Sequence, residues 1–127
     1  MSLSVKRINL VIDCEDAVVM ADFYNRLLGW EKTHPHANGW AALTSPSGSV
    51  LAFQEVEEGY EPPVWPWEGD KQAQMLHFDL CVDDLEEAVL YAVQCGARIA
   101  DTQYYKTSRT LFDPAGHPFC IDTDEQE

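Results

Sequence analysis

One histidine, one cysteine and two aspartates stand where strand periodicity would bring their side chains to a common face. His77 and Asp79 alternate along one β-rich run, and Cys120 and Asp122 alternate along another. A histidine that faces a cavity could hydrogen-bond a ligand or transfer a proton. Cys120 could act as a nucleophile if His77 took its proton, or it could be a small buried thiol. These side chains therefore indicate a ligand site or an inherited cavity lining.

Other polar side chains are predicted to face the same cavity. Asn9 and Asp13 lie on the corresponding face of an earlier run, and Gln54 lies near the end of another. Carboxylates are costly to bury without partners, so these aspartates should attract a cation or a basic side chain such as Arg109. The alternative is that one or more of them lies at an exposed sheet edge. We expect contacts to a ligand from Asn9, Asp13, Gln54, His77, Asp79, Cys120 and Asp122, while catalytic residues remain unknown.

The elements that position these residues recur at a constant offset of 68 residues. The matching segments are Asn9–Asp16 with His77–Asp84, Ser45–Gly48 with Asp113–Gly116, and Val50–Gln54 with Pro118–Asp122. A small duplicated unit cannot bury its own apolar face, so two copies are expected to pack together and enclose a cavity.

Each copy is predicted to contain a strand, a helix and three further strands. The expected strands are 7–14, 30–33, 39–44 and 50–55, then 75–82, 98–102, 105–112 and 118–123, with helices at 17–28 and 85–95. Aspartates stand at both helix starts and glycines at both ends, as capping requires. The fold class is therefore α+β: one domain over residues 1–127, with module one about 5–56, a linker 57–74 and module two about 75–124.

The linker is acidic and contains a proline- and tryptophan-rich stretch that cannot form a regular strand. Trp65 and Trp67 could close over a ligand, cover a sheet edge or simply pack the connection. Tyr104 and Tyr105 could line the pocket or belong to the core.

The formal charge is −14, from 22 acidic and 8 basic residues. This negative charge repels nucleic acid and anionic membranes and attracts cationic ligands, so the latter are the favoured partners. No run approaches the roughly 20 apolar residues of a membrane helix, and no signal peptide is recognisable, so we expect a cytoplasmic protein. Its cysteines, without C-x-x-C spacing, are expected to be reduced.

The chain resembles the vicinal oxygen chelate superfamily, which includes glyoxalase I, bleomycin-resistance proteins and extradiol dioxygenases, and within it the glyoxalase-like proteins. The stretches that carry the resemblance are Asp22–Trp30, Pro63–Pro66, Leu76–Ala88 and Phe112–Pro118. The resemblance implies two tandem βαβββ modules whose curved mixed sheets surround a central pocket. It also implies a homodimer, in which modules pair within one chain or exchange between two.

In metal-dependent relatives four ligands line that pocket, and the resemblance carries their positions onto Asn9, Ala52, His77 and Cys120. Only His77 is a standard match, since alanine cannot ligate and the glutamates are absent. We therefore predict no cofactor and no metal; a divalent ion, if bound, would use His77 with Cys120 or Asp122. No nucleotide-binding motif is present.

The sequence thus predicts a metal-free, bleomycin-resistance-like protein that binds a small organic molecule, of cationic or aromatic character. One alternative is a metal-dependent lyase or isomerase of the glyoxalase type that uses His77 with non-standard ligands. Another is a non-catalytic partner subunit.

Overall fold

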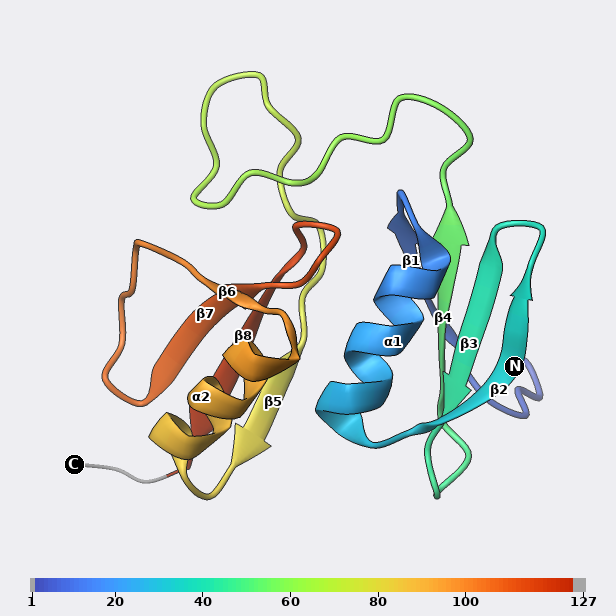
Figure 1. The fold of residues 1–127 in the computed structure, drawn as a ribbon, viewed down its shortest axis with the longest axis horizontal. Helices are drawn as coiled ribbons and strands as arrows, with labels where there is room; N and C mark the ends of the chain where they lie inside the picture. The colour runs from blue at the N-terminus through green and yellow to red at the C-terminus, as the bar shows by residue number, and fades with distance from the viewer. Residues whose placement is uncertain (1, 125–127) are drawn as a thin grey trace. The chain divides into compact units, whose positions relative to one another are not determined.

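A computed structural model describes residues 2–124, with only the backbone described for residues 34–37. The ends of the predicted domain, residue 1 and residues 125–127, lie outside this range. The chain forms two compact units, one up to Tyr60 and one from Glu61 (Figure 1). This boundary falls inside the predicted linker. Neither helix in the described range has the length and apolar content needed to cross a bilayer.

Each unit consists of one helix packed on a four-stranded mixed sheet, which confirms the α+β class and the two βαβββ modules. Unit 1 contains β1 (Leu10–Cys14), α1 (Ala17–Leu28), β2 (Glu31–Ala37), β3 (Trp40–Thr44) and β4 (Val50–Glu55). Unit 2 contains β5 (Asp79–Val82), α2 (Leu85–Cys95), β6 (Arg98–Ile99), β7 (Ser108–Phe112) and β8 (Pro118–Thr123). The strand orders are β1-β4-β3-β2 and β5-β8-β7-β6, and the first pair in each order is parallel.

The duplication extends to the hydrogen-bonding register of the two sheets. Both β3 and β4 begin and end 68 residues before β7 and β8. Val11 lies opposite Ala52 in the first parallel pair, and Asp79 lies opposite Cys120 in the second. The same offset relates these two pairs. Each residue of β5, β7 and β8 therefore has an identifiable counterpart 68 positions earlier in unit 1.

Local signals account for both helices. The Asp16 carboxylate accepts hydrogen bonds from the backbone N–H groups of Val18 and Val19 at 3.0 and 3.1 Å. Asp84 accepts one from the N–H of Glu87 at 3.0 Å. These caps satisfy amide groups that have no partner inside the helix, so the helices begin where the sequence predicts.

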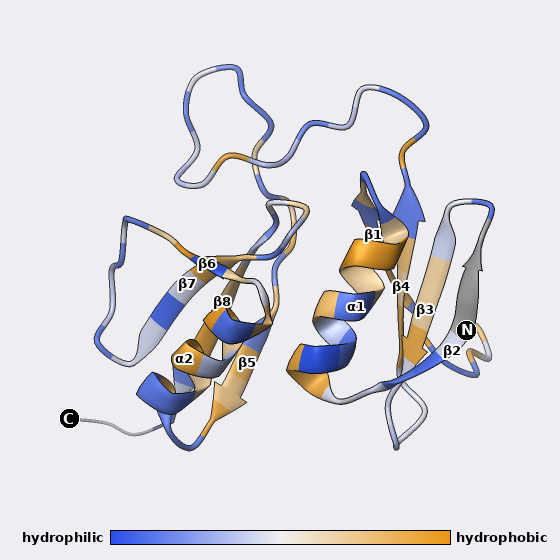
Figure 2. Ribbon diagram, in the orientation of Figure 1, coloured by the Kyte–Doolittle hydropathy of each residue, from blue (hydrophilic) through white to orange (hydrophobic). Residues whose placement is uncertain are grey.

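The core of each unit lies between the helix and the sheet. In unit 1, Tyr24 of α1 stacks on Phe53 of β4 with ring centroids 5.6 Å apart, and both side chains are buried. In unit 2, Val89 of α2 and Phe119 of β8 are buried. Figure 2 shows the corresponding hydropathy: both helices carry hydrophobic and hydrophilic residues along their length, as helices half-covered by a sheet do.

Several strand predictions were too long or too short. The first strands of the copies begin at Leu10 and Asp79 rather than at residues 7 and 75. The strand predicted at 98–102 covers only Arg98–Ile99. The strand predicted at 105–112 begins at Ser108, and the strand predicted at 30–33 continues to Ala37. The reason is that a strand needs a neighbour to pair with, and β propensity does not report where pairing ends.

Candidate functional site

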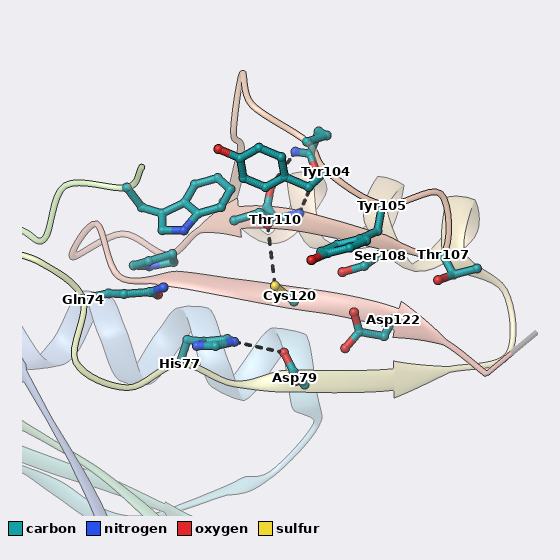
Figure 3. Close-up of a pocket in the computed structure, with 13 residues that line it drawn as sticks. Gln74, His77, Asp79, Tyr104, Tyr105, Thr107, Ser108, Thr110, Cys120 and Asp122 are labelled. Carbon is teal, nitrogen blue, oxygen red and sulfur yellow. Dashed lines mark hydrogen bonds and ion pairs between the residues drawn. The ribbon is translucent and has the colours of Figure 1, made fainter. Parts of the chain in front are cut away.

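Unit 2 contains a pocket of about 460 Å³ on the face of its sheet that carries the predicted ligand-binding residues (Figure 3). Its lining comprises Trp65, Gln74, His77, Asp79, Gln103, Tyr104, Tyr105, Thr107, Ser108, Thr110, Pro118, Cys120 and Asp122. The structure therefore brings together four of the seven residues predicted from the sequence: His77, Asp79, Cys120 and Asp122.

The β5–β8 ladder positions these four side chains. Asp79 lies directly opposite Cys120 in the parallel pair. The N–H of Cys120 donates to the carbonyl of Phe78 at 2.8 Å. Phe78 lies between His77 and Asp79 in the sequence, so this bond fixes the backbone from which both side chains project. Residues two apart in an extended chain face the same side. His77, which precedes β5, thus presents its ring on the same side as the Asp79 carboxylate.

Three possible metal-ligating groups meet on this face. His77 Nε2 lies 3.3 Å from Asp79 Oδ1, with the two side chains 40% and 59% exposed. One ligand atom from each of His77, Asp79 and Cys120 lies within 4.8 Å of the other two. The sequence placed Asp79 in the cavity but did not assign it to this donor set, because its role depends on the pairing of β5 with β8.

The Cys120 thiol holds its proton more strongly than an ordinary cysteine. Burial is the main cause that raises its pKa, and the negative charges of Asp79 and Asp122 raise it further, against the lowering effect of hydrogen bonds from Thr110 and Ser108. The Thr110 hydroxyl lies 3.6 Å from the sulfur. The surroundings of Cys120 therefore disfavour the thiolate that a nucleophile would need.

Aromatic rings form one wall of the pocket. Trp65 and Tyr104 pack edge to face at 5.8 Å between centroids, and Tyr104 and Tyr105 do so at 6.5 Å. In Figure 3, Tyr104 and Tyr105 lie across the strands from the donor group. Of the two alternatives that the sequence left open for Tyr104 and Tyr105, pocket lining holds. Trp65 also lines the pocket, and its closing over a ligand stays a prediction.

Gln103 is a site residue that the sequence analysis missed. Its amide nitrogen donates to the carbonyls of Ala100 and Thr110, and its amide oxygen accepts from the N–H of Thr110, all at 2.9 Å. These bonds anchor the loop that carries the two tyrosines to β7. A glutamine in a loop has no sequence signature for such a role, so no signal could have identified it.

Arg109 does not act as the counter-charge that the sequence suggested. It is not among the residues that line the pocket, and its guanidinium lies 3.2 Å from the carboxylate of Glu86 instead. Strand alternation explains the difference, because Ser108 and Thr110 face the pocket and Arg109 must point the other way. Neither lysine nor arginine is among the described residues that line this pocket.

The other three predicted residues belong to unit 1. Asp13 and Gln54 lie opposite each other on β1 and β4 and line a second, more open hollow of about 840 Å³. Asn9 is exposed, and its side-chain oxygen accepts a hydrogen bond from Arg7 Nε at 2.8 Å. Their contact with a ligand stays a prediction.

The four-ligand metal set of the superfamily does not fit this chain. At the unit 1 positions Ala52 has no donor atom and is fully buried, and the Asn9 oxygen is engaged with Arg7. At the unit 2 positions His77 keeps the imidazole of metal-dependent relatives, but the Cys120 thiol stands where those relatives have a glutamate. A hard ion such as Mg²⁺ prefers several oxygen ligands, which these positions do not supply.

Comparison with known proteins identifies the family. The model of the glyoxalase-like domain family matches residues 9–121, whereas no curated protein matches the sequence. Among solved structures, the chain is similar to a glyoxalase/bleomycin resistance protein/dioxygenase family enzyme from Burkholderia phytofirmans PsJN (TM-score 0.66, 17% identity, 91% of this chain and 95% of that chain). It is also similar to a glyoxylase/bleomycin resistance protein/dioxygenase domain from Frankia sp. EAN1pec (TM-score 0.67, 16% identity, 98% and 95%). A third is a glyoxalase-related enzyme from Fulvimarina pelagi (TM-score 0.67, 15% identity, 94% and 89%). This chain belongs to the glyoxalase-like domain family, as its resemblance to the vicinal oxygen chelate superfamily predicted.

Proposed function

We propose that this protein binds a small organic cation in the pocket of unit 2 and that it does so without a resident metal ion. The observation that carries the proposal is the composition of the lining: its described residues include two carboxylates and three aromatic rings and no lysine or arginine. A volume of about 460 Å³ is in the range of small-molecule sites.

The lining offers a cation two kinds of attraction. Asp79 and Asp122 supply negative charge on the strand side. The aromatic wall presents π-systems, which attract ammonium groups by about 0.5–2 kcal/mol each. A ligand with a positive charge and a flat apolar part would use both.

Gln74 adds a preference for a ligand with an N–H group. Its side-chain oxygen is buried and has no hydrogen-bond partner among the described residues, although Gln74 lines the pocket. An unsatisfied buried acceptor costs roughly 1–3 kcal/mol. A protonated amine that reached this oxygen would recover that cost, so we favour an amine over a quaternary ammonium ion.

The proposed role is sequestration of the ligand rather than its conversion. Two observations support this: asparagine, alanine and cysteine stand at three of the superfamily's four metal-ligand positions, and the surroundings of Cys120 disfavour its thiolate. The expected homodimer stays part of the proposal and is measurable by sedimentation.

Calorimetry on the full chain in excess EDTA tests the proposal with three related probes. Benzylammonium should bind, while neutral benzyl alcohol and anionic benzoate should not. At 100 times its dissociation constant, benzylammonium should also stabilise the protein by about 2.7 kcal/mol. Asp79→Asn and Asp122→Asn should each weaken binding about fivefold, near the upper limit for an exposed ion pair.

A matched control separates the pocket from the general acidity of the chain. Asp101→Asn removes the same charge from an exposed residue outside the pocket lining and should leave the affinity unchanged. Equal weakening by Asp101→Asn, or equal binding of benzyl alcohol, would overturn the proposal. A failure of every probe would favour the non-catalytic partner subunit.

The second candidate function is a metal-dependent lyase or isomerase of the glyoxalase type. The observation that favours it is the meeting of His77, Asp79 and Cys120. Metal analysis of protein purified without chelator discriminates between the two candidates. Stoichiometric metal that disappears in His77→Ala would replace the metal-free proposal with this one.

A further inference from the structure

We infer that Arg109 is a positioning residue for the pocket of unit 2. It holds the loop that carries Tyr104 and Tyr105, and it thereby sets the preference of the pocket for aromatic cations over aliphatic ones. The ligand is the organic cation of the proposed function, on which this inference rests. Arg109 itself lies on β7 and is not among the residues that line the pocket, so it acts through the loop.

The two modules differ in the segment that precedes their third strand. In unit 1, β2 continues to Ala37 and pairs with β3 in an antiparallel ladder. In unit 2, the ladder ends after Arg98 and Ile99, and residues 100–107 leave the sheet as the loop to β7 (Figure 1). Backbone carbonyls that a ladder would bond need other partners. A side chain that bonds them would fix the loop in one position.

Arg109 bonds the second half of this loop. Its Nη1 atom donates to the carbonyl of Tyr105 at 3.3 Å and to that of Lys106 at 3.1 Å. The same atom lies 3.0 Å from the carbonyl oxygen of Ser108, where β7 begins. The guanidinium is a rigid, permanently charged donor. With the Gln103 amide bonded to β7 nearer the start of the loop, both halves are held.

The loop carbonyls, and not the ion pair with Glu86, are the contacts of Arg109 that matter to the pocket. The Glu86 side chain is 79% exposed, and an ion pair so open to water stabilises little. The Arg109 side chain is only 29% exposed, so water competes less for its hydrogen bonds to the carbonyls. Removal of Glu86 should therefore leave the loop in place, whereas removal of Arg109 should release it.

The internal repeat shows that this arginine belongs to unit 2 alone. The residue 68 positions earlier is Ala41 of β3, whose side chain is buried and has no donor atom. There the ladder itself holds β2. The arginine thus occurs in the module whose corresponding segment has left the sheet. That segment is also the one that supplies two aromatic rings to a pocket.

The charge of Arg109 by itself predicts the opposite effect on ligand binding. Removal of a positive charge near the pocket would strengthen the binding of a cation. Displacement of the aromatic wall would weaken the binding of an aromatic ligand, because a ring–ring contact contributes a factor of about 2–10 in affinity. The direction of the change therefore distinguishes a positioning role from a purely electrostatic one.

Calorimetry on the full chain with two ammonium probes tests the inference. Benzylammonium and n-butylammonium carry the same charge, and only the first has a ring. Arg109→Gln should lower the ratio of their affinities, benzylammonium over n-butylammonium, by about 2–10-fold. Arg98→Gln is the matched control and should leave the ratio unchanged, because the Arg98 guanidinium packs on the Phe112 ring at 4.4 Å and not on the loop. Glu86→Gln should also leave it unchanged.

Hydrogen exchange of the backbone amides in residues 100–107 tests the loop without any ligand. Arg109→Gln should speed exchange there severalfold, and Arg98→Gln should not. Circular dichroism verifies the fold of each variant. Unchanged exchange in Arg109→Gln, an unchanged affinity ratio despite faster exchange, or an equal fall of the ratio in Arg98→Gln would overturn the inference. If the unaltered protein binds neither probe, the proposed function fails and the ligand preference fails with it, while the exchange rates still decide whether Arg109 positions the loop.

Discussion

Replacing Gly116 with alanine should destabilise the protein by about 2–5 kcal/mol and weaken ligand binding in the unit 2 pocket. Gly116 closes the turn after β7, where its N–H donates to the carbonyl of Asp113 at 2.9 Å, and its φ is +88°. A residue with a side chain pays roughly 1–2 kcal/mol in this left-handed region. That strain is the first part of the expected loss.

The second part comes from the connector that precedes β5. A Cβ atom at Gly116 would lie 2.7 Å from Cβ of Pro62, well inside the roughly 3.5 Å of an ordinary carbon contact. A proline ring cannot rotate away, so the connector must shift. Overpacking of this kind costs about 1–3 kcal/mol.

The repeat provides the control, Gly48→Ala. Gly48 closes the matching turn of unit 1, with φ of +96° and a bond from its N–H to Ser45. A Cβ at Gly48 meets no atom within 4 Å. This variant should therefore lose only the strain of about 1–2 kcal/mol.

Urea denaturation of both variants measures the difference in the free energy of unfolding. Calorimetry with benzylammonium adds a second measurement, because Trp65 of the pocket wall lies three residues after Pro62. Gly116→Ala should bind the probe more weakly, and Gly48→Ala should bind it as the unaltered protein does. Equal destabilisation by the two substitutions would refute the reasoning, since it would mean that Pro62 does not hold the turn.

Three further predictions concern the loop, the thiol and the caps. Gln103→Ala should cost about 1–3 kcal/mol in urea denaturation and weaken benzylammonium binding, because it leaves the Thr110 N–H without its partner; unchanged binding would contradict the anchoring role. The folded protein raises the pKa of Cys120 and so holds this proton more tightly than the unfolded chain. Stability should therefore fall as pH rises through and above the ordinary thiol range, and less steeply in Cys120→Ser; parallel pH profiles would contradict this. Asp16→Ala and Asp84→Ala should each lower the free energy of unfolding by about 1 kcal/mol in thermal denaturation, because each removes a helix cap; unchanged stability would contradict the capping role.

Features encoded within a few residues were predictable from the sequence. Both helices, the strands β4 and β8 and the turns between the last strands of each copy match their predictions. Apolar periodicity, an aspartate before each helix and a glycine after it act through neighbours in the chain. The offset of 68 residues revealed the duplicated module, and strand parity grouped His77 with Asp79 and Cys120 with Asp122.

The tertiary structure decided what depends on partners distant in the sequence. The lengths of β1, β5 and β6 follow from where pairing ends, which β propensity does not encode. The meeting of Asp79 with Cys120 needs the parallel register of β5 and β8. The anchoring bonds of Gln103 depend on how its loop returns to β7. Sequence alone thus identified the residue types and faces of the site, and only the folded sheet determined which of them lie within reach of one another.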